Sequence, residues 1–160
     1  MLSVTGNHNS EQVFCDVVLM PVESLDGMSS YTSSPAPPKV FILKALIDTG
    51  ATHTCITESA AKKLDLTPLG FVPTMGIHGV SEVRYYLFRV GFIKHETSDG
   101  QVSASDMAIL EKPIQGTELQ IEDAGFEVLL GMDALSCGNL HVWANGKFKF
   151  EFDNQNIPCL

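Results

Sequence analysis

Residues 40–51 read VFILKALIDTGA, an apolar run that ends abruptly in polar and small residues. Val40 to Ile47 is rich in β-branched and large apolar side chains, which is typical of a strand that enters a core. Asp48, Thr49 and Gly50 then interrupt the pattern, because Asp and Gly favour turns. The stretch therefore predicts a buried strand that ends in a loop headed by a carboxylate.

A second apolar run with the same construction lies far downstream, at residues 126–133 (FEVLLGMD). Phe126 to Leu130 predicts another strand, Gly131 ends it, and a short helix is expected over Met132 to Ser136. Asp133 would then lie near the helix N-terminus, where the helix dipole favours a carboxylate. A structural role is therefore preferred for Asp133 over a role as a second acid.

The one main helix is predicted at residues 57–66 (TESAAKKLDL), between these two runs. Thr57 is a good N-cap, and Glu58 suits the positive end of the helix dipole. An apolar stripe that includes Ala60 and Leu64 would face the core.

A long hairpin is predicted at residues 71–92. Strand-like sequence lies on both sides of a glycine-rich tip formed by Gly76, Ile77, His78 and Gly79. Such a hairpin would extend from the body of the protein.

Two further strands are predicted at Val13 to Val22 and at Val102 to Leu110. Residues 24–38 are rich in Ser, Pro and Gly, so a flexible loop is expected there. Residues 111–125 are interpreted as a connection. The stretch before Val13 could form a strand, and its composition does not decide this.

The chain is expected to close with a second hairpin, because Asn145-Gly146 stands between two apolar runs. Asn-Gly at such a position is the strongest short hairpin signal that a sequence can carry. The runs are Leu140 to Trp143 and Lys147 to Phe152. Trp143 is expected to pack in the core.

Composition points to one globular, β-leaning domain over residues 1–160, with its core at about residues 13–152. Hydrophobic residues make up 44% of the chain and charged residues only 18%, which excludes a disordered tail. A chain of 160 residues is long enough to bury a core without disulfides.

Charge and hydropathy exclude several kinds of partner. The formal net charge is −9, so a nucleic acid backbone or an anionic membrane surface would repel the protein. No apolar stretch approaches the length of about 20 residues that a membrane helix needs. The first residues do not have the form of a secretory signal, so a reducing cytoplasm is expected.

Cysteine and histidine give no sign of a metal or cofactor site. The four cysteines form no CxxC pair, and three of them lie among apolar neighbours, which predicts buried thiols. Cys55 is expected to be a protonated thiol rather than a nucleophile. His53 and His78 have no third ligand at a recognisable spacing, so a solvent-exposed or locally bonded His is preferred to a metal ligand.

Taken together, the Asp-Thr-Gly word after a strand, the glycine-bearing hairpin and the Leu-Leu-Gly word at residues 129–131 resemble the retropepsin-like aspartic protease family. The resemblance runs from about Val40 to about Phe152. It implies an all-β fold, a small closed barrel with one main helix, and a hairpin that forms a flap over the substrate.

The resemblance implies an aspartic endopeptidase that acts as a homodimer on polypeptides. Peptide hydrolysis by direct attack of water needs a carboxylate as base and a carboxylic acid to protonate the carbonyl oxygen. Two carboxyl groups about 3 Å apart share one proton and supply both, and aspartic proteases are the standard example of this effect. Asp48 is the one Asp in the chain that Thr-Gly or Ser-Gly follows, so a second copy must supply the other carboxylate.

The same resemblance assigns roles around Asp48. Thr49 would hydrogen-bond across a two-fold axis, and Gly50 would let the backbone approach the carboxyl oxygens; with Asp48 they form the predicted catalytic set. The predicted substrate-binding residues are Ala51, Thr52, Gly76, Ile77, His78, Gly79 and Val80.

Two departures from the retroviral pattern occur together. Acidic residues often follow Asp-Thr-Gly-Ala in viral members, whereas this chain has Thr52 and His53. An arginine often follows the apolar-apolar-Gly word, and here Met132 does. The sequence looks closer to bacterial and cellular relatives than to viral ones, because in those relatives Gly is followed by one residue and then Asp, as at residues 131–133.

Two other interpretations stay open. In the first, the chain is a dimerisation or peptide-binding module with the retropepsin fold and little or no proteolytic activity. In the second, it is an unrelated small β-barrel with a chance Asp-Thr-Gly. In the last case Asp48 would be an ordinary turn residue.

Overall fold

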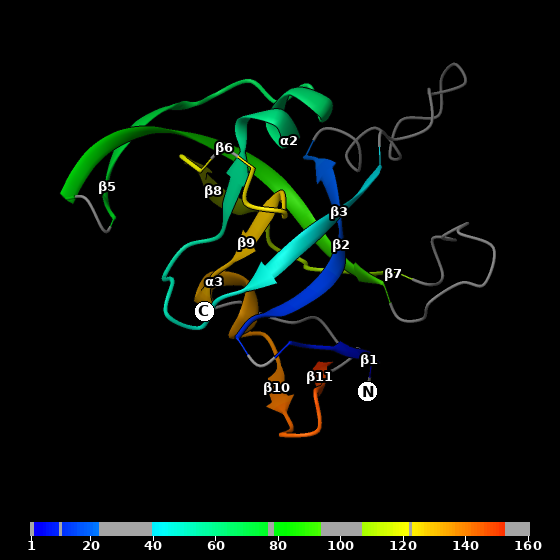
Figure 1. Cartoon of the computed structure of the whole chain (residues 1–160). Helices are drawn as coiled ribbons and strands as arrows, with labels where there is room; N and C mark the ends of the chain where they lie inside the picture. The colour runs from blue at the N-terminus through cyan, green and yellow to red at the C-terminus, as the bar shows by residue number, and fades with distance from the viewer. Residues whose placement is uncertain are drawn as a thin grey trace, which may run out of the picture.

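The computed structural model describes residues 2–9, 11–22, 40–76, 79–93, 107–121 and 123–152. Strands dominate this part of the chain, and two short helices accompany them (Figure 1). In chain order the elements are β1 (Leu2–Asn7), β2 (Val13–Pro21), β3 (Phe41–Ile47), β4 (Cys55–Thr57), α2 (Glu58–Lys63), β5 (Gly70–Gly76), β6 (Gly79–Ile93), β7 (Met107–Ile109), β8 (Ile114–Leu119), β9 (Val128–Leu130), α3 (Met132–Leu135), β10 (Asn139–Val142) and β11 (Lys147–Phe152).

Six of the strands close into a barrel. Hydrogen bonds connect them in the order β2-β3-β9-β4-β8-β6, and β6 pairs back to β2 from Phe88 to Phe92. The predicted small closed barrel, with its main helix and a short helix after Gly131, is confirmed. β5 and β7 add to β6 outside the ring.

The core fills the barrel, and along β6 every second side chain points into it. Tyr86, Phe88, Val90 and Phe92 are all buried, whereas the residues between 86 and 90 are exposed or half-buried. This is the two-residue period of a strand with one face inward. Burial of these apolar side chains stabilises the barrel.

A second, three-stranded sheet lies below the barrel in Figure 1, with the strand order β1-β11-β10. The rings of Phe92 and Phe150 are 5.2 Å apart between centroids and join this sheet to the barrel. The predicted Asn-Gly hairpin is confirmed, and Gly146 adopts the positive φ of 82° that such a turn requires.

One question left open by the sequence is answered at this sheet, and one expectation fails. The stretch before Val13 forms β1 (LSVTGN), which pairs with β11 along all six residues. Trp143 does not pack in the core. It is 46% exposed and stacks on the ring of His141, since it lies at the end of an edge strand.

The main helix α2 starts as predicted and ends early. Thr57 Oγ1 accepts a hydrogen bond from the Ala60 amide, so Thr57 is the N-cap. The helix ends at Lys63 rather than near Leu66, because Asp65 adopts a left-handed conformation with φ of 57°. The Leu66 amide then donates to the carbonyl of residue 61, which closes the helix with a Schellman motif.

The predicted connection at residues 111–125 is wrong in part, since β8 lies there. Gly and Glu are depleted in strands, but tertiary packing overrides their low propensity here. A Cβ at Gly116 would lie 2.4 Å from two ring atoms of Phe88, so glycine makes room for that buried ring. Thr117 and Tyr85 pair across the strands and help to close the barrel.

Several other expectations are met in part. The strand expected over residues 102–110 is described only as β7, and the predicted loop at residues 24–38 lies outside the described residues. Cys15 is buried, but Cys55 and Cys137 are only half-buried. In the described part of the chain, no helix has the length and apolar character needed to cross a membrane.

His8 connects the end of β1 to the turn between β10 and β11. Its backbone amide donates to the Gly146 carbonyl at 2.7 Å. Its ring nitrogens lie 2.6 Å from the Asn9 carbonyl oxygen and 2.8 Å from that of Trp143. Both acceptors are carbonyls, so only the doubly protonated ring satisfies both, and these bonds raise the pKa of His8.

The terminal sheet should therefore lose stability as pH rises. Because the pKa of His8 is raised above its unfolded value of 6.5, the contribution is complete below 6.5 and disappears as pH passes the folded value. Denaturant unfolding of the wild type and His8→Gln, from pH 5.5 to 8.5, should give a stability difference that shrinks with pH. A difference that does not change with pH would contradict this role.

Candidate active site

The carboxylate of Asp48 lies on the loop that follows β3. The Asp48 amide donates to the Leu130 carbonyl at 3.0 Å, which continues the pairing of β3 with β9 by one residue. The Gly50 amide donates to Asp48 Oδ1 at 2.9 Å, and the Ala51 amide donates to the Asp48 carbonyl at 3.3 Å. Asp48 is half-buried, and its carboxylate is oriented by its own loop.

The Asp-Thr-Gly motif and the Leu-Leu-Gly motif lie close together because the strands that carry them are parallel neighbours. Ala45 pairs with Val128 and Ile47 with Leu130, so both strands end at the same edge. The loop with Asp48 and the turn at Gly131 therefore begin side by side.

Glycine at position 131 is a steric requirement. A Cβ there would lie 2.5 Å from the carbonyl carbon of His53 and 2.6 Å from its oxygen. Two further bonds join the segments: the Met132 amide donates to the Ala51 carbonyl at 2.8 Å, and the Asp133 amide to the Thr52 carbonyl at 3.2 Å. The Asp48 loop is thus fixed along its length to the start of α3.

Thr54 lies between the Asp48 loop and the start of α3 and is fully buried. Its amide donates to both carboxylate oxygens of Asp133, at 2.9 and 3.0 Å, and its hydroxyl donates to Oδ1 at 2.6 Å. The same hydroxyl accepts a bond from the Gly131 amide at 3.2 Å. The structural role predicted for Asp133 is confirmed.

Thr54 is the site residue that the sequence did not reveal. A threonine between a polar loop and a short strand is common, and nothing in its neighbourhood distinguishes it from Thr52, which is exposed. Only the approach of Asp133, 79 residues away, shows its role.

The environment of Cys55 favours the protonated thiol that the sequence predicts. Burial raises the pKa of Cys55, the hydrogen bond with the Thr117 hydroxyl lowers it by less, and the carboxylates of Asp133 and Asp48 add smaller increases. Its Sγ lies 3.2 Å from Thr117 Oγ1. A thiol in this state is a poor nucleophile.

The other predicted residues divide into two groups. Thr49, Gly50 and Thr52 are exposed on the loop, and Ala51 is half-buried there. Gly76, Gly79 and Val80 lie exposed at the end of the β5–β6 hairpin, whereas Ile77 and His78 lie outside the described residues. In Figure 1 the hairpin and the Asp48 loop project toward the same side of the barrel.

The hairpin was predicted at residues 71–92 and runs from Gly70 to Ile93. Gly76 pairs with Gly79, and Met75 with Val80. Gly79 has a φ of +106°, which a residue with a side chain rarely adopts. A Cβ at either glycine would meet no atom within 4 Å, so this end of the hairpin is open to solvent.

Comparison with known proteins agrees with this geometry. The family described as gag-polyprotein putative aspartyl protease matches residues 42–137, which include both the Asp48 loop and Gly131. Among solved structures, a retropepsin-like aspartic protease from Rickettsia conorii is similar, with a TM-score of 0.52 and 14% identity. The match covers 94% of this chain and 90% of that one, and it shows the fold alone. No curated protein matches this chain.

Replacing Thr54 by valine tests how the loop is held. Thr54→Val keeps the shape of the side chain, but it removes a donor to Asp133 and leaves the Gly131 amide without its acceptor. A buried polar group left unsatisfied costs about 1–3 kcal/mol. Denaturant unfolding should show that Thr54→Val lowers the free energy of unfolding by about this amount.

Thr52→Val is the matched control, because that side chain is exposed two residues away. It should change the free energy of unfolding by less than about 0.5 kcal/mol. Equal stability of the two variants would mean that the Thr54 hydroxyl does not hold the loop.

Proposed function

Because the chain belongs to the gag-polyprotein putative aspartyl protease family, we propose that it is an aspartic endopeptidase whose active site forms from two copies. Each copy would contribute Asp48. The observation that carries the proposal is the fixed position of this carboxylate, at the end of β3 and against the Gly131 turn.

The mechanism follows from the chemistry of paired carboxyl groups. At about 3 Å, two such groups share one proton, so one is the general base and the other the general acid. The base would take a proton from water as the water attacks the scissile carbonyl carbon. The acid would protonate the carbonyl oxygen, which gives a tetrahedral diol. The carboxyl group that took the proton from water would then pass it to the amide nitrogen, while the other carboxylate takes a proton back from a hydroxyl of the diol. Cleavage of the C–N bond would release the amine and the new carboxylic acid and restore the shared proton.

A homodimer follows from the single Asp-Thr-Gly word. No other Asp in the sequence stands before Thr-Gly or Ser-Gly, so one chain supplies one half of the pair. Thr49 would hydrogen-bond across the two-fold axis. Gly50 would keep the approach to the carboxylate open, because a Cβ there would lie only 3.2 Å from Asp48 Oδ1.

The substrate would be an extended polypeptide held between the loop and the hairpin. Ala51 and Thr52 would contact it from the loop, and Gly76, Gly79 and Val80 from the hairpin. Ile77 and His78 are assigned the same role from the sequence. Exposed backbone at the glycines supports this role, because an extended peptide is recognised by main-chain hydrogen bonds.

One observation favours a second candidate, a dimerisation or peptide-binding module with little proteolysis. Met132 is 41% exposed and Thr52 is exposed, at the two places where viral relatives often carry charges. Without an ion pair there, the dimer would be weaker, and less of the complete site would form at a given concentration.

Cleavage of denatured polypeptide at mildly acid pH tests the proposal. Wild-type protein should cleave, and Asp48→Asn should reduce the rate by a factor on the order of 100 to 10,000, because Asn cannot act as acid or base. Asp16→Asn, an exposed change on β2, is the matched control and should keep full activity.

Sedimentation of the same samples separates the two candidates. A dimer with cleavage that depends on Asp48 supports the protease. A dimer without cleavage supports the binding module, and equal cleavage by the wild type and Asp48→Asn would exclude Asp48 as a catalytic group.

A further inference from the structure

The β5–β6 hairpin leaves the barrel at a definable point. Tyr85 pairs with Gly70 on β5 and also with Thr117 on β8. From Tyr85 onward β6 pairs with barrel strands, whereas Gly79 to Arg84 pairs with β5 within the described residues. Arg84 is therefore the last residue of the projecting arm, at its root.

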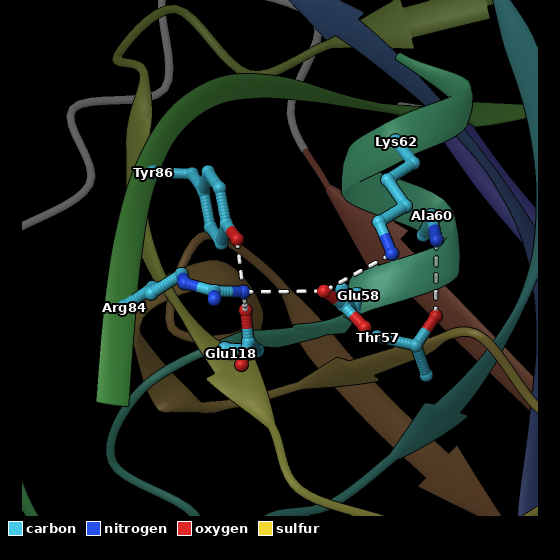
Figure 2. Close-up of polar contacts among 7 residues, drawn as sticks. All are labelled: Thr57, Glu58, Ala60, Lys62, Arg84, Tyr86 and Glu118. Atoms are coloured by element: carbon cyan, nitrogen blue, oxygen red, sulfur yellow. Dashed lines mark hydrogen bonds and ion pairs between the residues drawn. The ribbon is translucent and has the colours of Figure 1, made fainter. Parts of the chain in front are cut away.

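Arg84 joins two other elements at this root (Figure 2). Its Nη1 lies 3.2 Å from Glu58 Oε1, at the start of α2, and 3.2 Å from Glu118 Oε2, on β8. One nitrogen thus contacts two carboxylates that lie 60 residues apart in the chain.

Each of the two carboxylates also has a partner other than Arg84. Glu118 is only 15% exposed and accepts a 2.8 Å bond from the hydroxyl of Tyr86. Burial raises the pKa of Tyr86, so that hydroxyl keeps its proton. Glu58 follows the N-cap of α2 and pairs with Lys62 at 3.1 Å. Lys62 and Arg84 lower the pKa of Glu58, which keeps it ionised in mildly acid solution.

Both carboxylates also belong to elements that hold the Asp48 loop. Glu58 directly follows β4, the strand in which that loop ends. Ile56 on β4 pairs with Glu118, and the Thr117 amide donates to the Thr54 carbonyl at 3.1 Å. A residue fixed to both carboxylates is therefore fixed relative to the loop.

An isolated exposed ion pair contributes little. Val83 is buried beside Arg84, but large side chains further along the arm are exposed and give it little packing to fix its position. Phe71, Met75 and Val80 on the arm are 66%, 83% and 67% exposed. A strand rises about 3.3 Å per residue, so Gly79 lies roughly 17 Å from Arg84. Over that length, a rotation of the arm by about 10° at Arg84 would displace its tip by about 3 Å. Misplacement of about 1 Å is enough to impair an active site a hundredfold.

We propose that Arg84 is a positioning residue that fixes the β5–β6 hairpin over the Asp48 loop by joining Glu58 to Glu118. The proposal rests on the proposed function, since the position of the hairpin affects catalysis only if the hairpin covers substrate. Arg84 itself lies at the root of the arm and contacts no reacting atom.

Kinetics of three variants test this role. Arg84→Met should raise KM about tenfold and change kcat less, because contacts from the hairpin bind substrate and transition state alike. Arg84→Lys should stay within about threefold of the wild type, since both contacts come from one nitrogen that an ammonium can replace. Lys62→Met is the matched control, because it removes a cation from the same Glu58 without touching the hairpin.

Amide hydrogen exchange gives a readout that does not need activity. Arg84→Met should exchange faster within residues 70–76 and 79–84, with β2 and β3 unchanged, and Lys62→Met should match the wild type. If the wild type cleaves nothing, the proposed function fails. Hydrogen exchange would still test whether Arg84 fixes the hairpin. Unchanged exchange in the hairpin, or equal acceleration in β2 and β3, would overturn the proposal.

Discussion

The backbone of Gly131 packs directly on the backbone of His53, and this contact limits where the loop of Asp48 can lie. Any side chain at position 131 would overlap the His53 carbonyl group, so the loop and the turn are kept together by the absence of a Cβ. The parallel pairing of β3 with β9 brings both to one edge. Strand register, one glycine and one loop together place a carboxylate on a closed barrel.

Buried hydrogen bonds then keep that arrangement from relaxing. The Asp133 carboxylate accepts three bonds from Thr54, and the Thr54 hydroxyl accepts a fourth bond from Gly131. A buried network of this kind is stable only when every member has a partner. Asp133 is therefore structural while Asp48, whose side chain is bonded by the Gly50 amide, remains accessible for chemistry.

Local signals in the sequence were enough for much of the fold. The β5–β6 hairpin, the Thr57 cap and the turn at Asn145-Gly146 each depend on neighbouring residues, and all three predictions hold. β8 was missed because its evidence is not local: Gly116 makes room for the ring of Phe88, which is distant in sequence. Trp143 was misplaced because hydrophobicity does not distinguish an edge strand from a core strand. The candidate site shows the same difference between local and distant signals. Asp48 belongs to a motif that can be found in the sequence, whereas Thr54 belongs to none.

The two parts of the candidate site are held by different forces. The loop depends on buried hydrogen bonds and backbone packing, which dissolved salt scarcely affects. The hairpin depends at its root on Arg84, which is 41% exposed, and salt screens exposed charges within about 8 Å at physiological ionic strength. The chemistry proposed for Asp48 would require carboxyl groups fixed to a fraction of an ångström, whereas an arm that admitted a polypeptide would have to move. The rigid interactions accordingly surround the carboxylate, and the adjustable ones lie at the root of the arm.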